Sequence, residues 1–473
     1  MHRKILGAAL ALGVAHGAIA QTAPAGELRP DQVRFRALYK ELVETNTSLS
    51  VGSCTEAAAK MGAHLKAAGF PDSDITYFSV PDHPKEGGVV AILHGSSKTA
   101  KPMLLLGHLD VVEAKRADWT RDPFTFIEED GYFYGRGTSD MKVIDATWVD
   151  MLVRFKESKY TPKRTIKMAL TCGEETLAAF NGADYLARNK RDLIDAEFAL
   201  NEGGGGRADK DGHVQSQGVQ VGEKVVQQFR METTNPGGHS SVPIKDNAIY
   251  QLAQGLLKVR DYDFPLELND VTRAFFAKAG AGRTDETGKA MVAIAKDPTD
   301  KAAEAQLNKD RGFHSMLRTT CVATLLDGGH AENALPQRAG ANINCRMFPG
   351  DTMEGVKAQL EKAIGDPGVK LIPLQPIRGK SMPAPLDPKV IGPMEKVAAK
   401  YYPGAPVIPT MSTGASDALY LMPVGIPTYG VPGFYSGPEG SGAHGLNEHA
   451  SVKSVYLGRD YLTELVKTLA DAG

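Results

Sequence analysis

The sequence predicts an α/β protein in which helices cover a central sheet and a smaller α+β domain is inserted into the chain. Two observations lead to this expectation. From residue 30 to about residue 222, short apolar runs alternate with amphipathic stretches, as in a sheet that helices cover on both faces. After residue 222 the pattern changes to longer strands and separate helices, and the earlier alternation resumes after about residue 380.

The first α/β region contains several helices and a strongly apolar strand. The expected helices are 30–44, 55–68, 143–155 and about 178–189, and the expected strands that precede the apolar strand are 75–80 and 88–93. The run 103–112 (MLLLGHLDVV) is β-prone and breaks at Gly107, so His108 and Asp110 should follow the carboxyl end of a buried strand. Open α/β sheets usually carry their functional sites at that edge.

We assign residues 223–379 to the inserted domain, and residues 21–222 with 380–473 to the α/β domain that flanks it. The insertion is expected to contain strands over 223–234 and 369–373, helices over 246–259 and 352–365, and two further strands between these helices. The charged segment 270–316 should form solvated helices on the same inserted domain. The total length also favours two domains, because it exceeds what one hydrophobic core usually organises.

Residues 1–20 have the features of a secretory signal peptide. Arg3 and Lys4 precede an apolar run over 5–15, and small residues end the segment at Ala20. A membrane anchor is the alternative, but the run is shorter than a membrane-spanning helix requires. We therefore expect a mature chain that begins at Gln21 and is periplasmic or secreted, with no membrane contact once the leader is removed.

Charge and composition argue against nucleic acid as a partner. The chain has 54 Lys and Arg residues against 56 Asp and Glu residues, and no basic run is interleaved with aromatic residues. We therefore expect no nucleic-acid partner.

Four cysteines are too few for a disulfide scaffold, so the hydrophobic core should supply the stability. Cys172 lies in a predicted strand and is interpreted as a small buried side chain. Cys321 and Cys345 lie in two apolar runs that a hairpin centred near Asn333 would set opposite each other. A disulfide between them is left open here, because strand register cannot be derived from the sequence.

Carboxylates and imidazoles recur at strand ends, before a helix or in a glycine-rich loop. They are His108 and Asp110, Asp140, Glu174 and Glu175, Glu202, and His444. Each motif alone has a structural explanation, since Asp110 would serve as a turn residue and Asp140 as a helix cap. The series as a whole favours a site with two metal ions, because zinc takes imidazole and carboxylate ligands.

Eight short motifs occur in an order that resembles the di-zinc exopeptidases. They are HLDVV, GRGTSDMK, CGEE, NEGGGG, NPGGHSS, ENALPQ with CRMFPG, TGASDA and GAHGLNEHAS. This family includes glutamate carboxypeptidase, acetylornithine deacetylase, succinyl-diaminopimelate desuccinylase, aminoacylase and carnosinase, and the resemblance runs from about residue 30 to the end. It implies a mixed, mostly parallel sheet, and an inserted domain that serves for dimerisation and as a lid.

The resemblance also implies two divalent metal ions, most often Zn²⁺, with Co²⁺ or Mn²⁺ as substitutes. The implied ligands are His108 and Glu202 for one ion, Glu175 and His444 for the other, and Asp140 as the bridge between them. A cis peptide bond follows the bridging residue in relatives, so we expect one between Asp140 and Met141. His444 is preferred to His449 because the Gly-Ala-His arrangement fits the family pattern.

Adjacent glutamates on a strand would point in different directions unless the chain bends. The resemblance makes Glu175 a ligand and Glu174 the general base, which takes a proton from the activated water and later gives it to the leaving nitrogen. A solvated charge at a strand end is the structural alternative for either residue. Asp110 would hold the ring of His108 in the orientation that a metal ligand needs.

Three residues of the inserted domain are implied in substrate handling. In a homodimer, His239 would reach into the partner's site and stabilise the oxyanion. Arg346 would pair with a substrate carboxylate, and Asn333 would supply a further polar contact. The structural alternatives are an ordinary surface histidine and a solvated strand arginine.

The leading interpretation is an exported metal-dependent hydrolase that cleaves the amide bond of a dipeptide or N-acyl amino acid, of the carboxypeptidase or deacylase type. An aminopeptidase or dipeptidase of the same family is the alternative. A non-catalytic binding homologue would have lost parts of the metal set, whereas every ligand position and Glu174 hold suitable residues. A serine hydrolase is disfavoured, because neither Ser240 nor Ser416 lies in a Gly-x-Ser-x-Gly motif.

Overall fold

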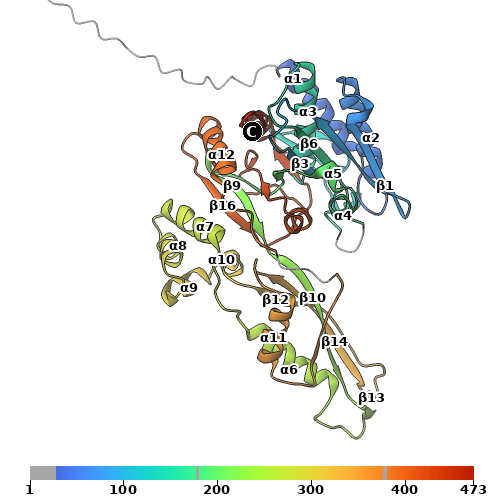
Figure 1. Ribbon diagram of the computed structural model, residues 1–473. Coiled ribbons are helices and arrows are strands. Elements are labelled where there is room, and N and C mark those ends of the chain that lie inside the picture. Colours follow the sequence, from blue (N-terminus) through green and yellow to red (C-terminus); the bar gives the residue numbers. More distant parts are fainter. Residues whose placement is uncertain (1–27, 177–179, 377–380, 473) are drawn as a thin grey trace, which may run out of the picture.

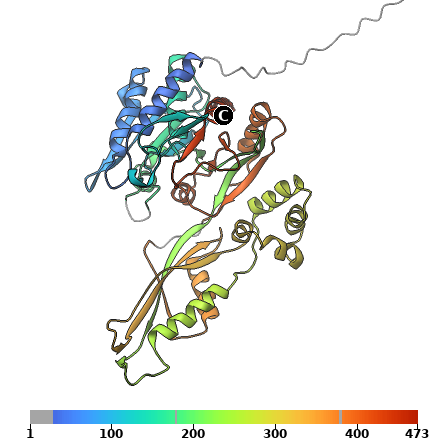
Figure 2. The ribbon, with the colours of Figure 1, turned by 180° about the vertical axis from the view of Figure 1, so that it is seen from behind.

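The computed structural model describes residues 28–176, 180–376 and 381–472. It contains a large mixed sheet with helices on both faces and a separate small antiparallel sheet domain (Figures 1 and 2). The predicted fold class is confirmed. The expected leader, the start of the mature chain at Gln21, the first residues of the helix expected near 178, and the return to the α/β domain at 380 lie outside the described residues.

The central sheet is parallel in its middle, and antiparallel pairs of strands occur towards both edges. In spatial order its strands are β1 (Ile75–Val80), β2 (His83–Leu93), β6 (Ile166–Thr171), β3 (Met103–His108), β7 (Phe198–Asn201), β17 (Thr428–Gly430), β9 (Val214–Glu223), β8 (Gly204–Ala208) and β18 (Tyr435–Ser436), with β16 (Val407–Ser412) paired to β9. Every residue of β3, β6 and β7 is buried, which explains why these strands are mostly apolar.

Alternate side chains of β3 lie on opposite faces of the sheet and belong to two different hydrophobic cores. Met103 and Leu105 belong to the core under α1 (Pro30–Glu44), α2 (Cys54–Ala67), α3 (Lys142–Glu157), α12 (Pro388–Tyr401) and α14 (Val452–Asp471). Leu104 and Leu106 belong to the core under α4 (Gly182–Asn189), α5 (Arg191–Ile194) and α13 (Ala418–Leu421). No helix within the described ranges is long and apolar enough to span a lipid bilayer.

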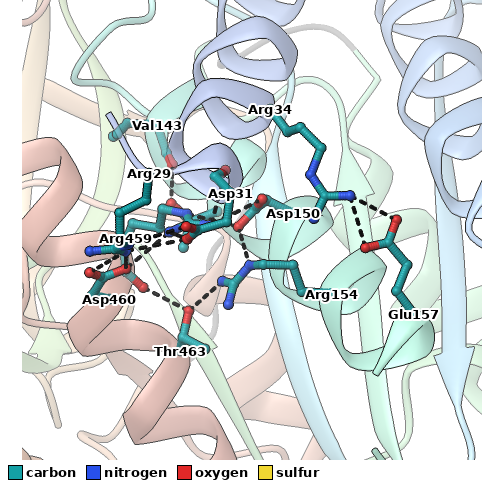
Figure 3. Close-up of polar contacts among 11 residues, drawn as sticks. Arg29, Asp31, Arg34, Val143, Asp150, Arg154, Glu157, Arg459, Asp460 and Thr463 are labelled. Atoms are coloured by element: carbon teal, nitrogen blue, oxygen red, sulfur yellow. Dashed lines mark hydrogen bonds and ion pairs between the residues drawn. The ribbon is translucent and has the colours of Figure 1, made fainter. Parts of the chain in front are cut away.

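A buried ion network joins the first and last helices (Figure 3). Arg459 of α14 is fully buried and donates to Asp150 of α3 (Nε to Oδ2, 2.9 Å) and to Asp31 of α1 (Nη1 to Oδ2, 2.7 Å). Arg29, which precedes α1, donates to Asp460 (Nη2 to Oδ2, 2.8 Å). Removing one partner of a buried pair leaves an uncompensated charge, at a cost of about 3–5 kcal/mol. The network therefore fixes α14 against α1 and α3.

The smaller sheet is antiparallel throughout. Its order is β12 (Thr320–Gly328), β14 (Arg338–Met347), β10 (Val225–Thr234) and β15 (Lys370–Pro373), and it packs against α6 (Ala248–Asp261) and α11 (Met353–Ile364). Only Lys224 separates β9 from β10, so one run of chain passes from the central sheet into the smaller sheet (Figure 1). Edge strand β12 leaves Val322, Leu325 and Leu326 exposed by 59%, 69% and 70%.

The segment 270–316 is helical, as expected, and its helices lie beside the central sheet rather than on the smaller sheet. Its helices are α7 (Asp270–Ala281), α8 (Glu286–Lys296), α9 (Lys301–Leu307) and α10 (Arg311–Met316), which share a small core of their own. α7 lies beside β16 of the central sheet (Figure 1), where Lys278 Nζ donates to the carbonyl of Val407 at 3.4 Å. Helical spacing of apolar residues predicts that a helix buries one face, but not which sheet receives it.

Both cysteine pairs are disulfide-bonded. Cys321 and Cys345 are opposite each other on β12 and β14, and the disulfide that the sequence left open is present. Cys54, at the start of α2, is bonded to Cys172, just after β6. Interpreting Cys172 only as a small buried side chain was wrong, because the sequence does not reveal that segments 118 residues apart meet.

Candidate active site

Five potential metal ligands converge from five separate segments of the chain. They are His108, Asp140, Glu175, Glu202 and His444, and each has a ligand atom within 4.8 Å of two others. His108 ends β3, Glu202 directly follows β7, and Glu175 comes four residues after β6. These three parallel strands lie side by side, so their carboxyl ends deliver three of the five residues to one edge of the central sheet.

Asp140 lies between the two imidazoles. Its Oδ1 is 3.5 Å from His108 Nε2, and its Oδ2 is 3.1 Å from His444 Nε2. On the first side, Glu202 Oε1 is 3.6 Å from His108 Nε2, and on the second side Glu175 Oε2 is 2.9 Å from His444 Nε2. One carboxylate thus faces two sets of ligand atoms, as a bridge between two ions requires.

The environment of His108 fits a cation. Its side chain is buried, and Nδ1 lies 3.1 Å from the backbone carbonyl of Asp110, which makes Nδ1 the protonated nitrogen. Nε2 is buried without a hydrogen-bond partner in the described part of the chain. A buried imidazole lone pair that faces two carboxylates suits a divalent ion such as Zn²⁺.

The site is crowded with groups that bind protons in the absence of cations. Burial raises the pKa of Glu202 to about 7 and the pKa of Glu174 to about 10. Hydrogen bonds with Asp140 and Glu175 raise the pKa of His444 to about 10. Divalent cations placed among these groups would lower these pKa values, because positive charge favours the ionised carboxylates and the neutral imidazole.

The chain bends at Gly173, so Glu174 and Glu175 both face the site. Gly173 has φ +97°, and an added Cβ would collide with the carbonyl of Phe180. Ligand atoms of His108, Glu174 and Glu175 lie within 4.8 Å of one another. Strand alternation does not separate the two glutamates, since β6 ends before them.

The Asp110 carboxylate holds the turn that carries Glu174 and Glu175, called here the glutamate turn. Its Oδ2 accepts the backbone N–H of Glu175 at 3.0 Å, and its Oδ1 accepts that of Glu174 at 3.4 Å. Oδ1 is 3.7 Å from His108 Nδ1, farther than the Asp110 backbone carbonyl. The expectation that this carboxylate orients the ring is therefore corrected, because the carbonyl orients the ring and the carboxylate positions the turn.

His444, and not His449, is brought to Asp140 and Glu175. His444 lies in a glycine-rich loop with φ +59°, and its side chain is 57% exposed. His449 lies on β19 (His449–Ser451), where it pairs with Tyr134 of a neighbouring strand. The two histidines therefore have separate surroundings, although only four residues separate them.

His239 and Asn333 lie together, but they lie away from the ligand cluster of the same chain. β11 (Gly238–His239) pairs with β13 (Ala334–Leu335), and the backbone N–H of Ser240 donates to the carbonyl of Asn333 at 3.0 Å. This pair is a separate two-stranded sheet at the end of the smaller domain that is farthest from the central sheet (Figures 1 and 2). His239 is exposed there.

Arg346 lies near the junction of the two sheets. It is opposite Val226 at the start of β10, two residues from Lys224. Its side chain is partly buried, and it forms no hydrogen bond or ion pair with another described residue. Burial lowers the pKa of Arg346, but a guanidinium remains charged at any working pH. No acidic side chain of the described residues neutralises this cation, which leaves it able to bind an anionic ligand.

Two features of the Asp140 loop stand out. The Asp140–Met141 peptide is cis, as expected. Glu448 was not singled out by sequence reasoning, yet its carboxylate accepts the backbone N–H of Asp140 at 2.9 Å. Its position directly after Asn447 in the His444 loop was the only signal in the sequence. A sequence motif does not show which backbone groups a carboxylate will contact.

The fold and the cluster define a metal-dependent hydrolase. The chain belongs to Peptidase family M20/M25/M40, whose profile matches residues 104–468. It is 24% identical over 450 residues to the N-fatty-acyl-amino acid synthase/hydrolase PM20D1 of Homo sapiens, covering 93% of this chain and 88% of that protein. It is 26% identical over 388 residues to probable carboxypeptidase S-like 2 of Dictyostelium discoideum, covering 79% and 72%.

Solved structures share the fold. The M20 family metallo-carboxypeptidase Sso-CP2 from Sulfolobus solfataricus has a TM-score of 0.67 and 20% identity, covering 94% of this chain and 100% of that chain. Human carnosine dipeptidase 1 has a TM-score of 0.62 and 17% identity, covering 93% and 96%. YXEP of Bacillus subtilis, described as a dinuclear metal binding peptidase from the M20 family, has a TM-score of 0.57 and 14% identity, covering 94% and 99%.

Proposed function

We propose that the protein is an exported hydrolase that uses two divalent ions to cleave the amide bond of a dipeptide or an N-acyl amino acid. The observation that carries this proposal is the position of Asp140, which presents one oxygen to His108 and the other to His444. Relatives named as carboxypeptidases and as an N-fatty-acyl-amino acid synthase/hydrolase support the same bond class.

His108 and Glu202 would hold one ion, Glu175 and His444 the other, and Asp140 both. Bound ions would polarise the scissile carbonyl and lower the pKa of a water between them. The ligand set suits Zn²⁺, and Co²⁺ or Mn²⁺ are alternatives. The experiment is removal of metal by a chelator, which should abolish hydrolysis until Zn²⁺ is restored, while a serine-directed reagent should have no effect.

Glu174 would act as the general base. It reaches the centre from the same turn as Glu175, but it is not needed to complete either set of ligands. Its carboxylate would take a proton from the attacking water and return it to the leaving nitrogen. Burial raises the pKa of Glu174 in the metal-free protein, and bound cations would lower that pKa so that the carboxylate could accept the proton.

Arg346 would recognise the terminal carboxylate of the substrate, which places the enzyme in the carboxypeptidase or deacylase class. Its guanidinium has no acidic partner among the described residues and can grip a carboxylate with two parallel hydrogen bonds. Asn333 would add a polar contact from the partner subunit. We expect hydrolysis of substrates with a free α-carboxylate and not of their C-terminal amides.

Replacement of Arg346 tests this assignment. Arg346→Ala should lower kcat/KM for the acid substrate by an amount that corresponds to about 2–5 kcal/mol, the scale of breaking a desolvated charge pair. Arg338→Ala is a matched control on the same strand, since Arg338 is exposed and paired with Glu232. Equal hydrolysis of acid and amide by the native enzyme would contradict the assignment and point to an aminopeptidase instead.

We also propose a homodimer formed through the smaller sheet. β12 is an edge strand with exposed apolar side chains, and such an edge is a site for pairing with another chain. His239 and Asn333, remote from the ligands of their own chain, would then serve the partner's site. His239 would donate to the oxyanion, a contribution of about 100- to 1,000-fold in turnover.

Export is proposed from the leader-like residues 1–20. Two disulfides in the chain suit an oxidising compartment, periplasmic or secreted. Cell fractionation with N-terminal sequencing tests this, and the expected result is mature protein that begins at Gln21 outside the cytoplasm. Full-length protein retained in the cytoplasm would contradict it.

A further inference from the structure

Glu448 is a fully buried carboxylate that accepts five hydrogen bonds from one loop. Its Oε2 accepts from Arg136 Nη1 at 2.8 Å and from the backbone N–H of Gly137 at 2.9 Å. Its Oε1 accepts from the backbone N–H of Ser139 at 2.8 Å, from Ser139 Oγ at 3.1 Å and from the backbone N–H of Asp140 at 2.9 Å. The loop that carries Asp140 is thus wrapped around one ionised side chain.

The same residue ties this loop to the loop that carries His444. Glu448 follows His444 by four residues, and its backbone carbonyl accepts the N–H of Gly135 at 3.1 Å. Arg136, which donates Nη1 to the Glu448 carboxylate, also donates Nη2 to the carbonyl of Gly445 at 2.9 Å. The two loops are therefore joined on both sides of the Glu448 carboxylate.

The two proposed metal positions differ in what holds their ligands. His108 ends β3 and Glu202 directly follows β7, so central strands fix both residues. His444 lies in a loop that has three glycines between residues 440 and 445, and it belongs to no helix or strand. The loop has a turn hydrogen bond of its own, from the Gly445 N–H to the carbonyl of Gly442 at 2.8 Å, and the Glu448 cluster adds a contact from outside the loop one residue from His444, at Gly445.

We propose that Glu448 is a positioning residue that fixes His444 relative to Asp140 and thereby sets metal occupancy at the position formed by Asp140, Glu175 and His444. This inference rests on the proposed two-ion site. The Glu448 carboxylate is saturated by the Asp140 loop, so it acts through the backbone of two loops rather than as a ligand. Loss of the Glu448 carboxylate should weaken metal binding at this position more than metal binding at the position of His108 and Glu202.

The test is a titration of metal-free protein with Co²⁺, followed by visible absorption and by calorimetry. Glu448→Gln keeps the shape of the side chain but turns an amide N–H₂ toward backbone N–H donors, so several of the five bonds are lost. We expect two ions in the native protein. In the variant, one ion should bind with native affinity and the other about 10- to 100-fold more weakly, the usual effect of losing a residue that orients a ligand.

Glu439→Gln is the matched control, because Glu439 is an exposed carboxylate near the same loop, bonded only to Tyr132 in the described residues. It should bind both ions as the native protein does. Thermal unfolding of the metal-free variants separates a general loss of stability from a selective loss of one ion.

Each contrary outcome has a distinct meaning. Unchanged affinity at both positions in Glu448→Gln, or equal weakening at both, overturns the inference and leaves the two-ion site in place. Failure of the native protein to bind two ions overturns the proposed function instead. If Glu448→Gln does not fold, Arg136→Met removes the bond to Gly445 while most bonds to Glu448 remain. The same selective loss is expected there, and unchanged binding overturns the inference.

Discussion

Asp110 and Glu175 are joined by a hydrogen bond in which the backbone N–H of Glu175 donates to Asp110 Oδ2 at 3.0 Å. Asp110 also follows His108 by two residues and presents its backbone carbonyl to that ring. One aspartate therefore positions a proposed ligand of each ion, although it is not itself one of the proposed ligands. The two halves of the site are coupled through the protein as well as through the shared carboxylate of Asp140.

The first prediction concerns Asp110→Asn. The amide group cannot accept both N–H groups of the glutamate turn, so the turn should lose its fixed orientation. We expect metal affinity and turnover each to fall about 10- to 100-fold. Equilibrium dialysis and steady-state kinetics measure the two effects, with Glu113→Gln as a control on an exposed carboxylate bonded to Ser50. Native values for both quantities would refute the positioning role.

The second prediction concerns Glu174→Gln. The proposed ligands stay in place while the base is removed, so two ions should remain bound and turnover should fall by about two to four orders of magnitude. Metal analysis of the purified variant, together with its kcat, provides the measurement. Loss of an ion would indicate that the roles of Glu174 and Glu175 are exchanged.

The third prediction uses mixed dimers. His239→Ala and Glu174→Gln should each be nearly inactive alone, because one lacks the oxyanion donor and the other lacks the base. After subunit exchange, one site of each mixed dimer contains both groups, so part of the activity should return. Exchange is verified by two affinity tags on the two variants. No recovery after verified exchange would mean that His239 does not act across an interface.

The fourth prediction concerns pH and Glu223, at the end of β9. Its Oε2 accepts from Ser416 Oγ at 2.7 Å, and its Oε1 has no partner in the described part of the chain. Burial raises its pKa from 4.5 to about 8. Because the folded state holds this proton more tightly, the stabilisation is fully present below pH 4.5 and is lost as the pH rises through 8.

The stability of Glu223→Gln should therefore increase relative to that of the native protein as the pH rises. Between pH 5 and pH 9, the difference in free energy of unfolding should shift in favour of the variant by about 2–4 kcal/mol. Urea denaturation of both metal-free proteins measures this shift, with the exposed Glu354 replaced by Gln as a control. A difference that is independent of pH would show that Glu223 is not protonated in the folded state.

Local features of the fold could be predicted from the sequence. α1 and β1 have the predicted bounds, because a proline at the first helical position and a change to β-prone residues mark them. The ends of two strands, at His108 and just before Glu202, follow from apolar runs that break at glycine or at a charge. These patterns depend only on near neighbours in the chain.

Contacts between distant segments could not be predicted in the same way. Cys54, at the start of α2, meets Cys172, just after β6, across 118 residues of sequence. Glu448 reaches the backbone of Asp140 across 308 residues, and backbone N–H groups carry no sequence signature. The set of ligands could be predicted because several of them follow parallel strands, whose carboxyl ends meet at one edge of the sheet. The residues that orient these ligands can be identified only in the three-dimensional structure.

The interleaving of the two ends of the chain also determines the order in which the protein can form. β17 lies between β7 and β9, so a growing chain cannot close the central sheet before residue 430 has been made. The Arg459 network cannot form before the last helix exists. The smaller sheet needs only residues 225–373. Domains generally fold as units. We therefore expect the smaller sheet to form first, while the central sheet still lacks the strands and helix that the C-terminal part of the chain supplies.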